Sequence, residues 1–427
     1  MQLHTVAAGE TLSAIGRIYG VDPGLIARVN GLQPPYPLAG GQSLLVLTPS
    51  ILHTVQPGDT LWSVALQYGV SPLELLRNNP NLQGLARLYP GEVLVIAWED
   101  VPGRAIDLNG YAYPYVDEAV LRGILPYSGY LAPFTFGVSE SGGVVDLNDS
   151  AQLRLADRYG VTPVFHLSTL TEDGSFSNER AAYVLSDPAR QAALAETAVS
   201  LAVSRGYGAM DVDFEFIYPD QAEPYAQFIT ILREKANAQG LEVWVALAPK
   251  TSADQAGVLY EGHNYKLLGE AADAVLLMTY EWGYTYGPPM AVAPIQSVRR
   301  VLDYAVTEIP PEKIFLGFPN YAYNWTLPFS AGESRADSLS NVEAPLLAAR
   351  VGAEIRFDET GQTPYFNYTD AQGRVHEVWF EDPRSCLAKF RLLDEYGFRG
   401  VGVWNYMRPF PACFSLLSAL HRTGPDR

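Results

Sequence analysis

The stretch YGAMDVDFEF (residues 207–216) puts an acidic residue at every second position of an apolar segment. Side chains two residues apart on a β-strand face the same side, about 6.6 Å from one another. Asp211, Asp213 and Glu215 therefore share one face of a predicted strand. The opposite face is apolar and consists of Met210, Val212, Phe214 and Phe216. We expect helices to cover the apolar face and the acids to point into the interior of the fold.

Like charges in a low-dielectric interior cannot all ionise freely, so at least one of these acids is expected to hold its proton near neutral pH. A solvated strand with alternating acids is the alternative, and such apolar flanks disfavour it. In a barrel enzyme the chemistry takes place at the C-terminal ends of the strands. A row of acids that climbs toward this mouth indicates proton-transfer chemistry.

The chain around this stretch alternates short apolar runs with longer amphipathic ones, which predicts an α/β fold. The predicted strands are residues 106–114, 130–138, 162–170, 208–216, 241–249, 274–282, 313–321 and 400–406. Predicted helices lie at 187–206 and 221–240, and within 290–310 and 382–397. This pattern predicts a (β/α)₈ TIM barrel over residues 104–427.

An open doubly wound sheet is the competing architecture. It usually has a glycine-rich loop after the first strand, and the sequence has none there. Residues 331–378, between the last two predicted strands, are too long for a plain connection. We expect them to form an α+β insertion that makes a wall of the active-site cleft.

The first hundred residues repeat at an offset of 49 positions. LHTVAAGETL (3–12) aligns with LHTVQPGDTL (52–61), and each copy continues through YGV to an asparagine and a closing apolar strand. This self-similarity predicts two small βααβ domains at residues 2–48 and 52–97. The repeated pattern resembles the LysM module, which implies binding of N-acetylglucosamine-containing glycans such as peptidoglycan or chitin. Two linked modules on a polymer raise the effective concentration of the second contact.

Three segments of the C-terminal domain resemble glycoside hydrolase family 18. They are DVDFE (211–215), LLMTYEWG (276–283) and Trp404 in GVGVWNY. The sequence differs from the family signature at Gly208, Ala209 and Phe214. VFHLSTL (164–170) stands where the family has S-x-G-G.

The resemblance implies a retaining, substrate-assisted reaction, since this family is an exception to the usual scheme of two catalytic carboxylates. It makes Glu215 the general acid, and Asp213 the residue that orients the substrate acetamido group, with Asp211 sharing a proton beneath it. Tyr280 is implied to bind the acetamido oxygen, and Trp404 to form the apolar floor.

Further residues near the predicted strand ends are candidates for sugar binding, with loop packing as the alternative for most of them. The candidates are Tyr111, Tyr113, Glu281, Trp282, Asn320, Tyr321 and Trp325.

Several classes of function are disfavoured. The net charge of −18, without a basic run, argues against a nucleic-acid partner. The six histidines lack paired spacing, so we expect neither a metal nor a cofactor. No apolar run is long enough to span a membrane, and MQLHTVAAGETL (1–12) lacks the features of a signal peptide. Cys386 and Cys413 are expected to be unrelated thiols in the core or at the surface, with a single disulfide bridge between them as the alternative.

Two LysM-like repeats before a family 18 barrel resemble the spore cortical-fragment-lytic enzymes. This resemblance implies an N-acetylglucosaminidase that acts on peptidoglycan, associated with the spore coat and cortex or with the cell wall. We expect a monomer. A chitinase or chitooligosaccharide hydrolase is the alternative enzyme, and a glycan-binding spore-coat protein is the alternative without catalysis. The three acids together with Tyr280 favour catalysis.

Overall fold

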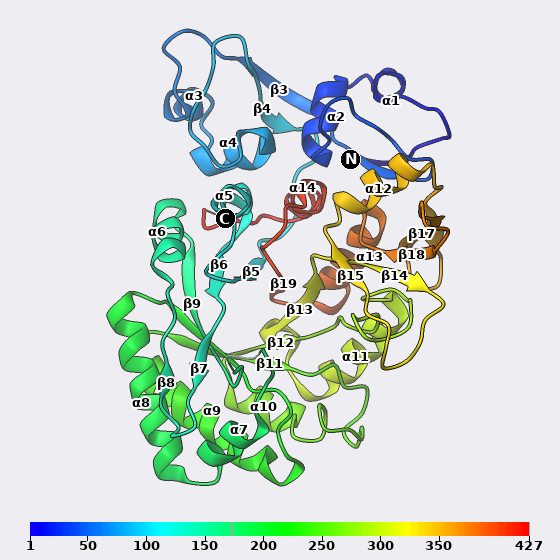
Figure 1. The fold of residues 1–427 in the computed structure, drawn as a ribbon. Helices are drawn as coiled ribbons and strands as arrows, with labels where there is room; N and C mark the ends of the chain where they lie inside the picture. Colours follow the sequence, from blue (N-terminus) through cyan, green and yellow to red (C-terminus); the bar gives the residue numbers. More distant parts are fainter. Residues whose placement is uncertain (172–173, 427) are drawn as a thin grey trace.

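The computed structural model describes residues 1–171 and 174–426. The chain forms a barrel, a lobe inserted into the barrel, and two small N-terminal modules that lie beside α5, α14 and α12 (Figure 1).

Within the described residues, eight parallel strands close into a barrel, which confirms the predicted fold. Each strand pairs with the next, and β19 pairs with β5 to complete the ring. In order around the ring, the strands are β5 (Asp107–Ala112), β6 (Tyr130–Pro133), β9 (Thr162–Ser168), β10 (Ala209–Asp213), β11 (Glu242–Leu247), β12 (Ala274–Leu277), β13 (Ile314–Pro319) and β19 (Gly400–Trp404). A hairpin of β7 (Phe136–Val138) and β8 (Val144–Val145) pairs with β9.

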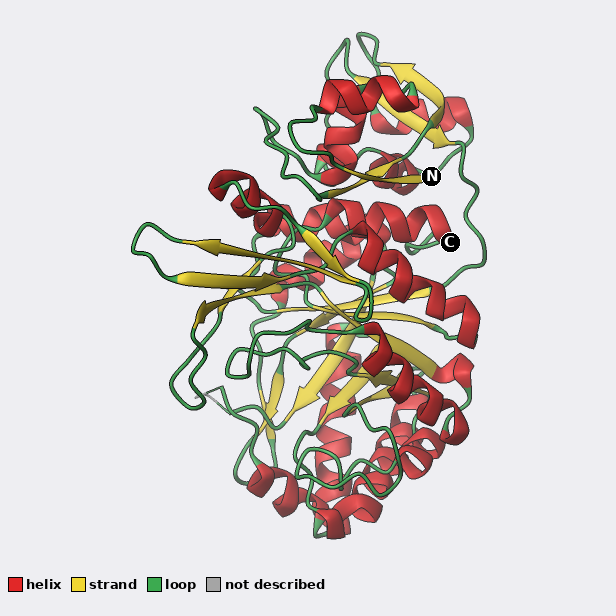
Figure 2. Ribbon diagram, turned by 90° about the vertical axis from the view of Figure 1, so that its right-hand side faces the viewer, coloured by secondary structure: helices red, strands yellow, loops and turns green. Residues whose placement is uncertain are grey.

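Helices surround the barrel on its outside (Figure 2). They are α5 (Glu118–Ile124), α6 (Ser150–Tyr159), α7 (Asn178–Leu185), α8 (Pro188–Arg205), α9 (Ala222–Asn237), α10 (Tyr265–Ala271), α11 (Ile295–Glu308), α13 (Pro383–Tyr396) and α14 (Pro411–Leu420). Short 3₁₀ turns are η1 (Pro80–Leu82), η2 (Leu125–Tyr127), η3 (Pro219–Gln221) and η4 (Pro311–Lys313). The Asp187 side chain caps the start of α8, and Gly206 ends it with a φ of 77°. Local sequence therefore sets the limits of the helix that leads into β10.

The two faces of β10 separate as the alternation predicts. Ala209 belongs to the apolar cluster inside the barrel, and Asp211 and Asp213 lie on the same side. Met210 and Val212 belong to the core between the strands and the helices. The expected strand up to residue 216 is too long, because β10 ends at Asp213. Phe216 has a φ of 54° and is half-buried, and so it does not continue the helix-facing row.

The inserted lobe is an antiparallel sheet with one packed helix. Its strands are ordered β15 (Asp337–Leu339), β14 (Ala322–Leu327), β18 (Val375–Trp379), β17 (Thr363–Thr369) and β16 (Arg356–Asp358), and its helix is α12 (Glu343–Val351). The sheet starts at Ala322, because β14 follows β13 after only two residues. The inserted sheet thus begins directly at the carboxyl end of a barrel strand.

Each N-terminal module has two helices on an antiparallel strand pair. The first contains β1 (Gln2–Thr5), α1 (Leu12–Tyr19), α2 (Pro23–Asn30) and β2 (Ser43–Val46). The second contains β3 (Pro49–Thr54), α3 (Leu61–Tyr68), α4 (Pro72–Asn78) and β4 (Val93–Trp98).

The repeated residues make the same contacts in both modules. His4 Nε2 lies 2.9 Å from Glu10 Oε2 in the first module, and His53 Nε2 lies 2.9 Å from Asp59 Oδ2 in the second. The buried Asn30 side chain bonds to the backbone N–H and C=O of Leu45, at 2.8 and 2.7 Å. Asn79 repeats this pair of bonds in the second module. The duplicated sequence therefore encodes a duplicated set of structural hydrogen bonds.

Direct contacts fix the modules to the rest of the chain. In the first module, the Gly40 carbonyl accepts a 2.8 Å bond from Ile355 N–H in the inserted lobe. In the second, Arg77 forms a 2.6 Å ion pair with Asp426 and donates to the Pro126 carbonyl. The barrel and both modules therefore share interfaces.

Both cysteines are buried, free thiols. Cys386 lies on α13 and Cys413 on α14, and their side chains interact with each other, which helps to raise the pKa of Cys386. The expectation of two unrelated thiols is wrong in this respect.

Among the helices of the described residues, none combines the length and the apolar character that a bilayer crossing requires.

Candidate active site

A cavity of about 230 Å³ opens where the barrel strands end. Asp213 and Glu215 line it from the end of β10, and Tyr280 and Glu281 from the segment after β12. Trp404, the last residue of β19, lines the same cavity. The structure thus brings together the acids, the phenol and the indole that the sequence singled out.

Asp211 is fully buried below Asp213, and the Tyr111 hydroxyl donates a 2.7 Å hydrogen bond to its Oδ2. Burial raises the pKa of Asp211 to about 6, and the bond from Tyr111 opposes this rise. Burial also raises the pKa of Asp213 well above its usual value, and the charges of Glu215 and Asp211 raise it further. The two aspartates therefore retain a proton near neutral pH.

Glu215 has the titration behaviour of a general acid. Burial raises its pKa to about 7, and the nearby charge of Glu281 contributes. A carboxyl group with a pKa near neutrality is protonated in much of the population and can still release its proton. The Tyr280 pKa is raised well above its usual value by burial and by the surrounding carboxylates, so this phenol remains a hydrogen-bond donor.

Glu281 is held at the mouth of the cavity by two phenols. The Tyr321 hydroxyl donates to Glu281 Oε1, and the Tyr323 hydroxyl donates to the same atom at 3.2 Å. Burial nevertheless raises the Glu281 pKa. Tyr321 therefore reaches the site through Glu281, and Tyr323 is a neighbour that the sequence did not reveal.

Aromatic rings form an apolar wall around Trp404. Its ring centroid lies 4.7 Å from that of Phe134, 5.8 Å from that of Tyr111 and 6.1 Å from that of Tyr113. Tyr113 also stacks on Tyr115 at 5.2 Å, and the Tyr115 side chain is 75% exposed. This stack extends the aromatic surface out of the cavity.

Besides Tyr321, three candidate binding residues do not line the cavity. Trp325 is 1% exposed, and its indole N–H donates to the Gly287 carbonyl. Asn320 is buried, and its amide donates to two carbonyls of the segment that follows β19. Trp282 packs against the main core. We correct their predicted role from sugar contact to support of the surrounding loops.

Two buried histidines lie close to these acids. His166 Nε2 is 3.7 Å from Asp213 Oδ2 and 3.9 Å from Asp211 Oδ2. His263 accepts a bond from Ala248 N–H and pairs through Nε2 with the Phe214 carbonyl, directly before Glu215. His166 lies two residues before Ser168 on the same strand, so the alternation could have placed it inside the barrel. His263 lies in a loop, where no side-chain alternation predicts its position.

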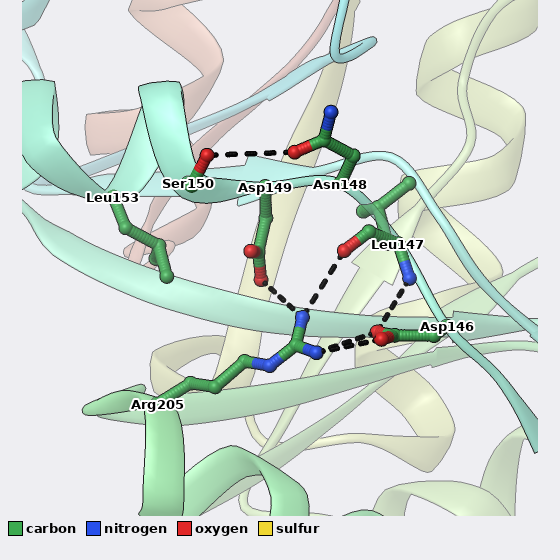
Figure 3. Close-up of a pocket in the computed structure, with 7 residues that line it drawn as sticks. All are labelled: Asp146, Leu147, Asn148, Asp149, Ser150, Leu153 and Arg205. Carbon is green, nitrogen blue, oxygen red and sulfur yellow. Dashed lines mark hydrogen bonds and ion pairs between the residues drawn. The ribbon is translucent and has the colours of Figure 1, made fainter.

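A separate pocket near α6 contains an ion-pair network. Figure 3 shows the Arg205 guanidinium between Asp146 and Asp149, at 2.7 and 3.1 Å. Tyr207 also donates to Asp149, at 2.6 Å. Arg205 bonds to both carboxylates, so the network joins the start of α6 to the end of α8. Within the described residues, no group of three or more His, Cys, Asp or Glu is arranged to hold a metal ion.

Comparison with known proteins identifies the class of this fold and cavity. The model of glycosyl hydrolases family 18 matches residues 174–408, and the LysM domain model matches residues 4–46 and 53–97. The first match covers more than half of the chain. The chain therefore belongs to glycoside hydrolase family 18, and it carries two LysM domains.

Among its relatives, the cortical fragment-lytic enzyme of Bacillus subtilis (strain 168) is 39% identical, over 98% of this chain and 97% of the relative. The crystal structure of the Bacillus megaterium QM B1551 spore cortex-lytic enzyme SleL is 36% identical with a TM-score of 0.82, and 99% of this chain and 98% of that one are covered. The Bacillus cereus spore cortex-lytic enzyme SleL gives 34% identity and a TM-score of 0.83, with 98% of both chains covered.

Proposed function

We propose that this chain hydrolyses spore-cortex peptidoglycan as a retaining N-acetylglucosaminidase. The observation that carries the proposal is the single cavity lined by Glu215, Asp213, Tyr280 and Trp404. The relatives that match nearly the whole chain, LysM domains included, are named for lysis of cortex or cortical fragments. That agreement supports cortex peptidoglycan as the substrate over free chitooligosaccharides.

Glu215 is the proposed general acid. Its raised pKa keeps a proton available for the oxygen of the glycosidic bond. As that bond breaks, the acetamido oxygen of the same sugar attacks the anomeric carbon and forms a cyclic oxazolinium ion. The ionised Glu215 then removes a proton from the water that opens this ring, so the acid is restored and the configuration is retained.

Asp213 and Tyr280 are proposed to hold the acetamido group from two sides. The Asp213 carboxylate accepts the acetamido N–H and offsets the positive charge that develops on the ring. The Tyr280 phenol donates to the acetamido oxygen, which directs that oxygen at the anomeric carbon. Asp211 takes up the proton that Asp213 gives up, because it lies directly below and has a raised pKa. A water-poor cavity strengthens each of these interactions.

The aromatic wall around Trp404 suits the apolar face of a sugar ring. The LysM domains are proposed to hold the polymer while the barrel cleaves it, which places the protein at the spore cortex or the cell wall. One chain carries both the binding domains and the whole cavity, so a monomer suffices for this activity.

The decisive experiment compares wild type with Glu215→Gln on purified cortical fragments, with the products identified by mass spectrometry. We expect wild type to release reducing N-acetylglucosamine ends and Glu215→Gln to lose this activity by at least about 100-fold. Glu359→Gln, at an exposed position of the inserted lobe, is the matched control and should retain full activity.

Retained hydrolysis by Glu215→Gln would refute the assignment of the acid. A wild type that prefers chitooligosaccharides in a parallel digest would favour the chitinase alternative. Binding to peptidoglycan without any product would favour a glycan-binding protein that lacks catalysis.

A further inference from the structure

His166 is built into the site but has no role in the steps above. It lies on β9 directly beside Asp211 in the sheet register, and Ser168 lies beside Asp213. The side chain is 1% exposed, and its Nε2 faces the Oδ2 atoms of Asp211 and Asp213 at 3.9 and 3.7 Å. One ring nitrogen is thus nearly equidistant from the two carboxyl groups.

The other ring nitrogen indicates which tautomer is present. His166 Nδ1 lies 2.7 Å from Thr135 Oγ1, which also lies 3.0 Å from the Phe136 carbonyl, 3.3 Å from the His166 carbonyl and 3.0 Å from Ser168 Oγ. Carbonyl oxygens only accept hydrogen bonds, so they draw the single hydroxyl proton of Thr135. The Thr135 oxygen then accepts from Nδ1–H. In this arrangement Nε2 presents a bare lone pair to the aspartates.

The ring is held in place and stays neutral. It packs edge-on against Tyr111 at 5.3 Å and against Phe134 at 4.7 Å. Burial lowers its pKa to about 3. The titratable groups that face it are Tyr111 from β5 and both aspartates from β10, with Tyr280 and Glu215 above them at the cavity. Asp211 and Asp213 each also have a buried Oδ1 without a hydrogen-bond partner among the described residues.

We infer that His166 is a positioning residue that keeps one proton on the pair of aspartates until a substrate acetamido group binds. Its bare Nε2 lies beyond hydrogen-bond distance of both Oδ2 atoms, but its lone pair faces them and disfavours a second negative charge there. This inference rests on the proposed function. When Asp213 turns to the substrate, its proton passes to Asp211, and the Nε2 lone pair continues to favour one proton on the pair. No proton enters or leaves the buried group, so the aspartates together keep one negative charge throughout.

The first test reads the tautomer without any assay of activity. Long-range ¹H–¹⁵N spectra distinguish the two protonation states of a neutral imidazole, and the His166→Phe spectrum identifies the signals of His166. We expect a proton on Nδ1 and no titration between about pH 5 and 8, where a free histidine titrates. A proton on Nε2, or a ring that titrates in this range, would overturn the inference.

The second test uses kinetics on a chromogenic N-acetylglucosaminide. His166→Phe keeps the ring volume and removes both nitrogens, and we expect kcat to fall about 10- to 100-fold with KM changed less than about threefold. A lone pair that faces the carboxyl groups raises their pKa values. Its removal should therefore move the acid limb of the pH profile to lower pH.

His166→Gln can place an amide oxygen near the aspartates and should recover most of the lost kcat. His421→Phe replaces another buried histidine near a carboxylate, far from the cavity, and should leave the pH profile unchanged. Equal loss in His166→Phe and His166→Gln, or an acid limb that moves up, would contradict the positioning role. A wild type that does not cleave the glycoside would refute the proposed function alone, because the tautomer is measured independently.

Discussion

The Tyr111 hydroxyl donates a 2.7 Å hydrogen bond to Oδ2 of Asp211, and this bond opposes the rise in the Asp211 pKa that burial causes. Tyr111→Phe removes the donor and should raise that pKa by about one unit. In the proposed mechanism Asp211 accepts the proton of Asp213, so the acid limb of kcat should move to higher pH. His166→Phe is expected to move the same limb in the opposite direction.

The control for this prediction is Tyr113→Phe. Tyr113 lines the same cavity, but its hydroxyl does not bond to either aspartate. Its acid limb should stay at the wild-type position. An unchanged acid limb in Tyr111→Phe would mean that Asp211 does not take part in the proton transfer.

The basic limb of activity should follow Glu215. Its pKa is raised to about 7, first by burial and then by the charge of Glu281. A general acid works only while protonated, so kcat/KM should decline above about pH 7. Glu281→Gln removes the negative charge, which lowers the Glu215 pKa and should move the decline to lower pH. The check is the pH profile of kcat/KM for wild type, Glu281→Gln and Glu359→Gln. The profile of Glu359→Gln should match that of wild type.

Glu215 should also reduce the stability of the folded protein at high pH. Its folded-state pKa of about 7 lies above the ordinary value of 4.5. The folded state therefore binds more protons, and its free energy of unfolding decreases as the pH rises from about 4.5 to 7. Glu215→Gln should be about 1–3 kcal/mol more stable than wild type at pH 8, with no gain near pH 4. Denaturant unfolding at both pH values measures the difference. A gain of equal size at both would point to packing as its cause.

The exposed stack of Tyr115 on Tyr113 should bind sugar rings beyond the bond that is cleaved. Tyr115→Ala removes a largely exposed ring outside the cavity, so the chemical step should be unaffected. We expect KM for long cortical fragments to rise about 2- to 10-fold, in line with about 0.5–1.5 kcal/mol for an aromatic contact, while kcat changes little. A short chromogenic glycoside should show no change in either constant. The same loss on both substrates would place the effect inside the cavity.

The alternation of apolar strands with amphipathic helices was sufficient to predict the barrel. Period-two alternation predicted the central acids, because Asp211 and Asp213 occupy consecutive interior positions of one strand. His166 on the neighbouring strand also occupies an interior position by the same alternation. It could have been found from VFHLSTL (164–170), although its closeness to the aspartates depends on the strand register. Loop residues show no such alternation. Tyr323 and His263 reach the site through hydrogen bonds that only the folded chain brings together.

Two of the predicted sugar-binding residues fail to line the cavity for the same reason. Asn320 and Trp325 follow a barrel strand closely, where sugar contacts are common, but β14 begins at Ala322 and turns the chain into the inserted sheet. Trp325 therefore joins a small buried cluster with Tyr321 and Tyr323, against which Tyr280 and Trp404 of the cavity pack. Phe216 leaves the predicted helix-facing row for a different reason. Its positive φ after the end of β10 breaks the strand alternation. Neither a new sheet pairing nor a single backbone reversal is visible in side-chain periodicity.

The contact between the first LysM domain and the inserted lobe can be tested at one glycine. A Cβ on Gly41 would lie 1.9 Å from the Ile355 carbonyl oxygen, which is closer than any real contact, and Gly41 has a φ of 79°. Gly9 has a φ of 77° in the same domain, but a Cβ there would meet nothing within 4 Å. Both alanine variants carry the backbone strain of about 1–2 kcal/mol, and only Gly41→Ala also forces the domain away from the lobe.

We therefore expect Gly41→Ala to increase protease cleavage between the first LysM domain and the barrel and to reduce turnover of insoluble cortex by several-fold. Because the cavity is not touched, turnover of a small chromogenic glycoside should remain within about twofold of wild type. Gly9→Ala should show only a modest loss of thermal stability. If both variants are cleaved at the same rate, the close approach of Gly41 to Ile355 does not hold the domain in place, and the LysM domain positions the polymer without a fixed orientation to the barrel.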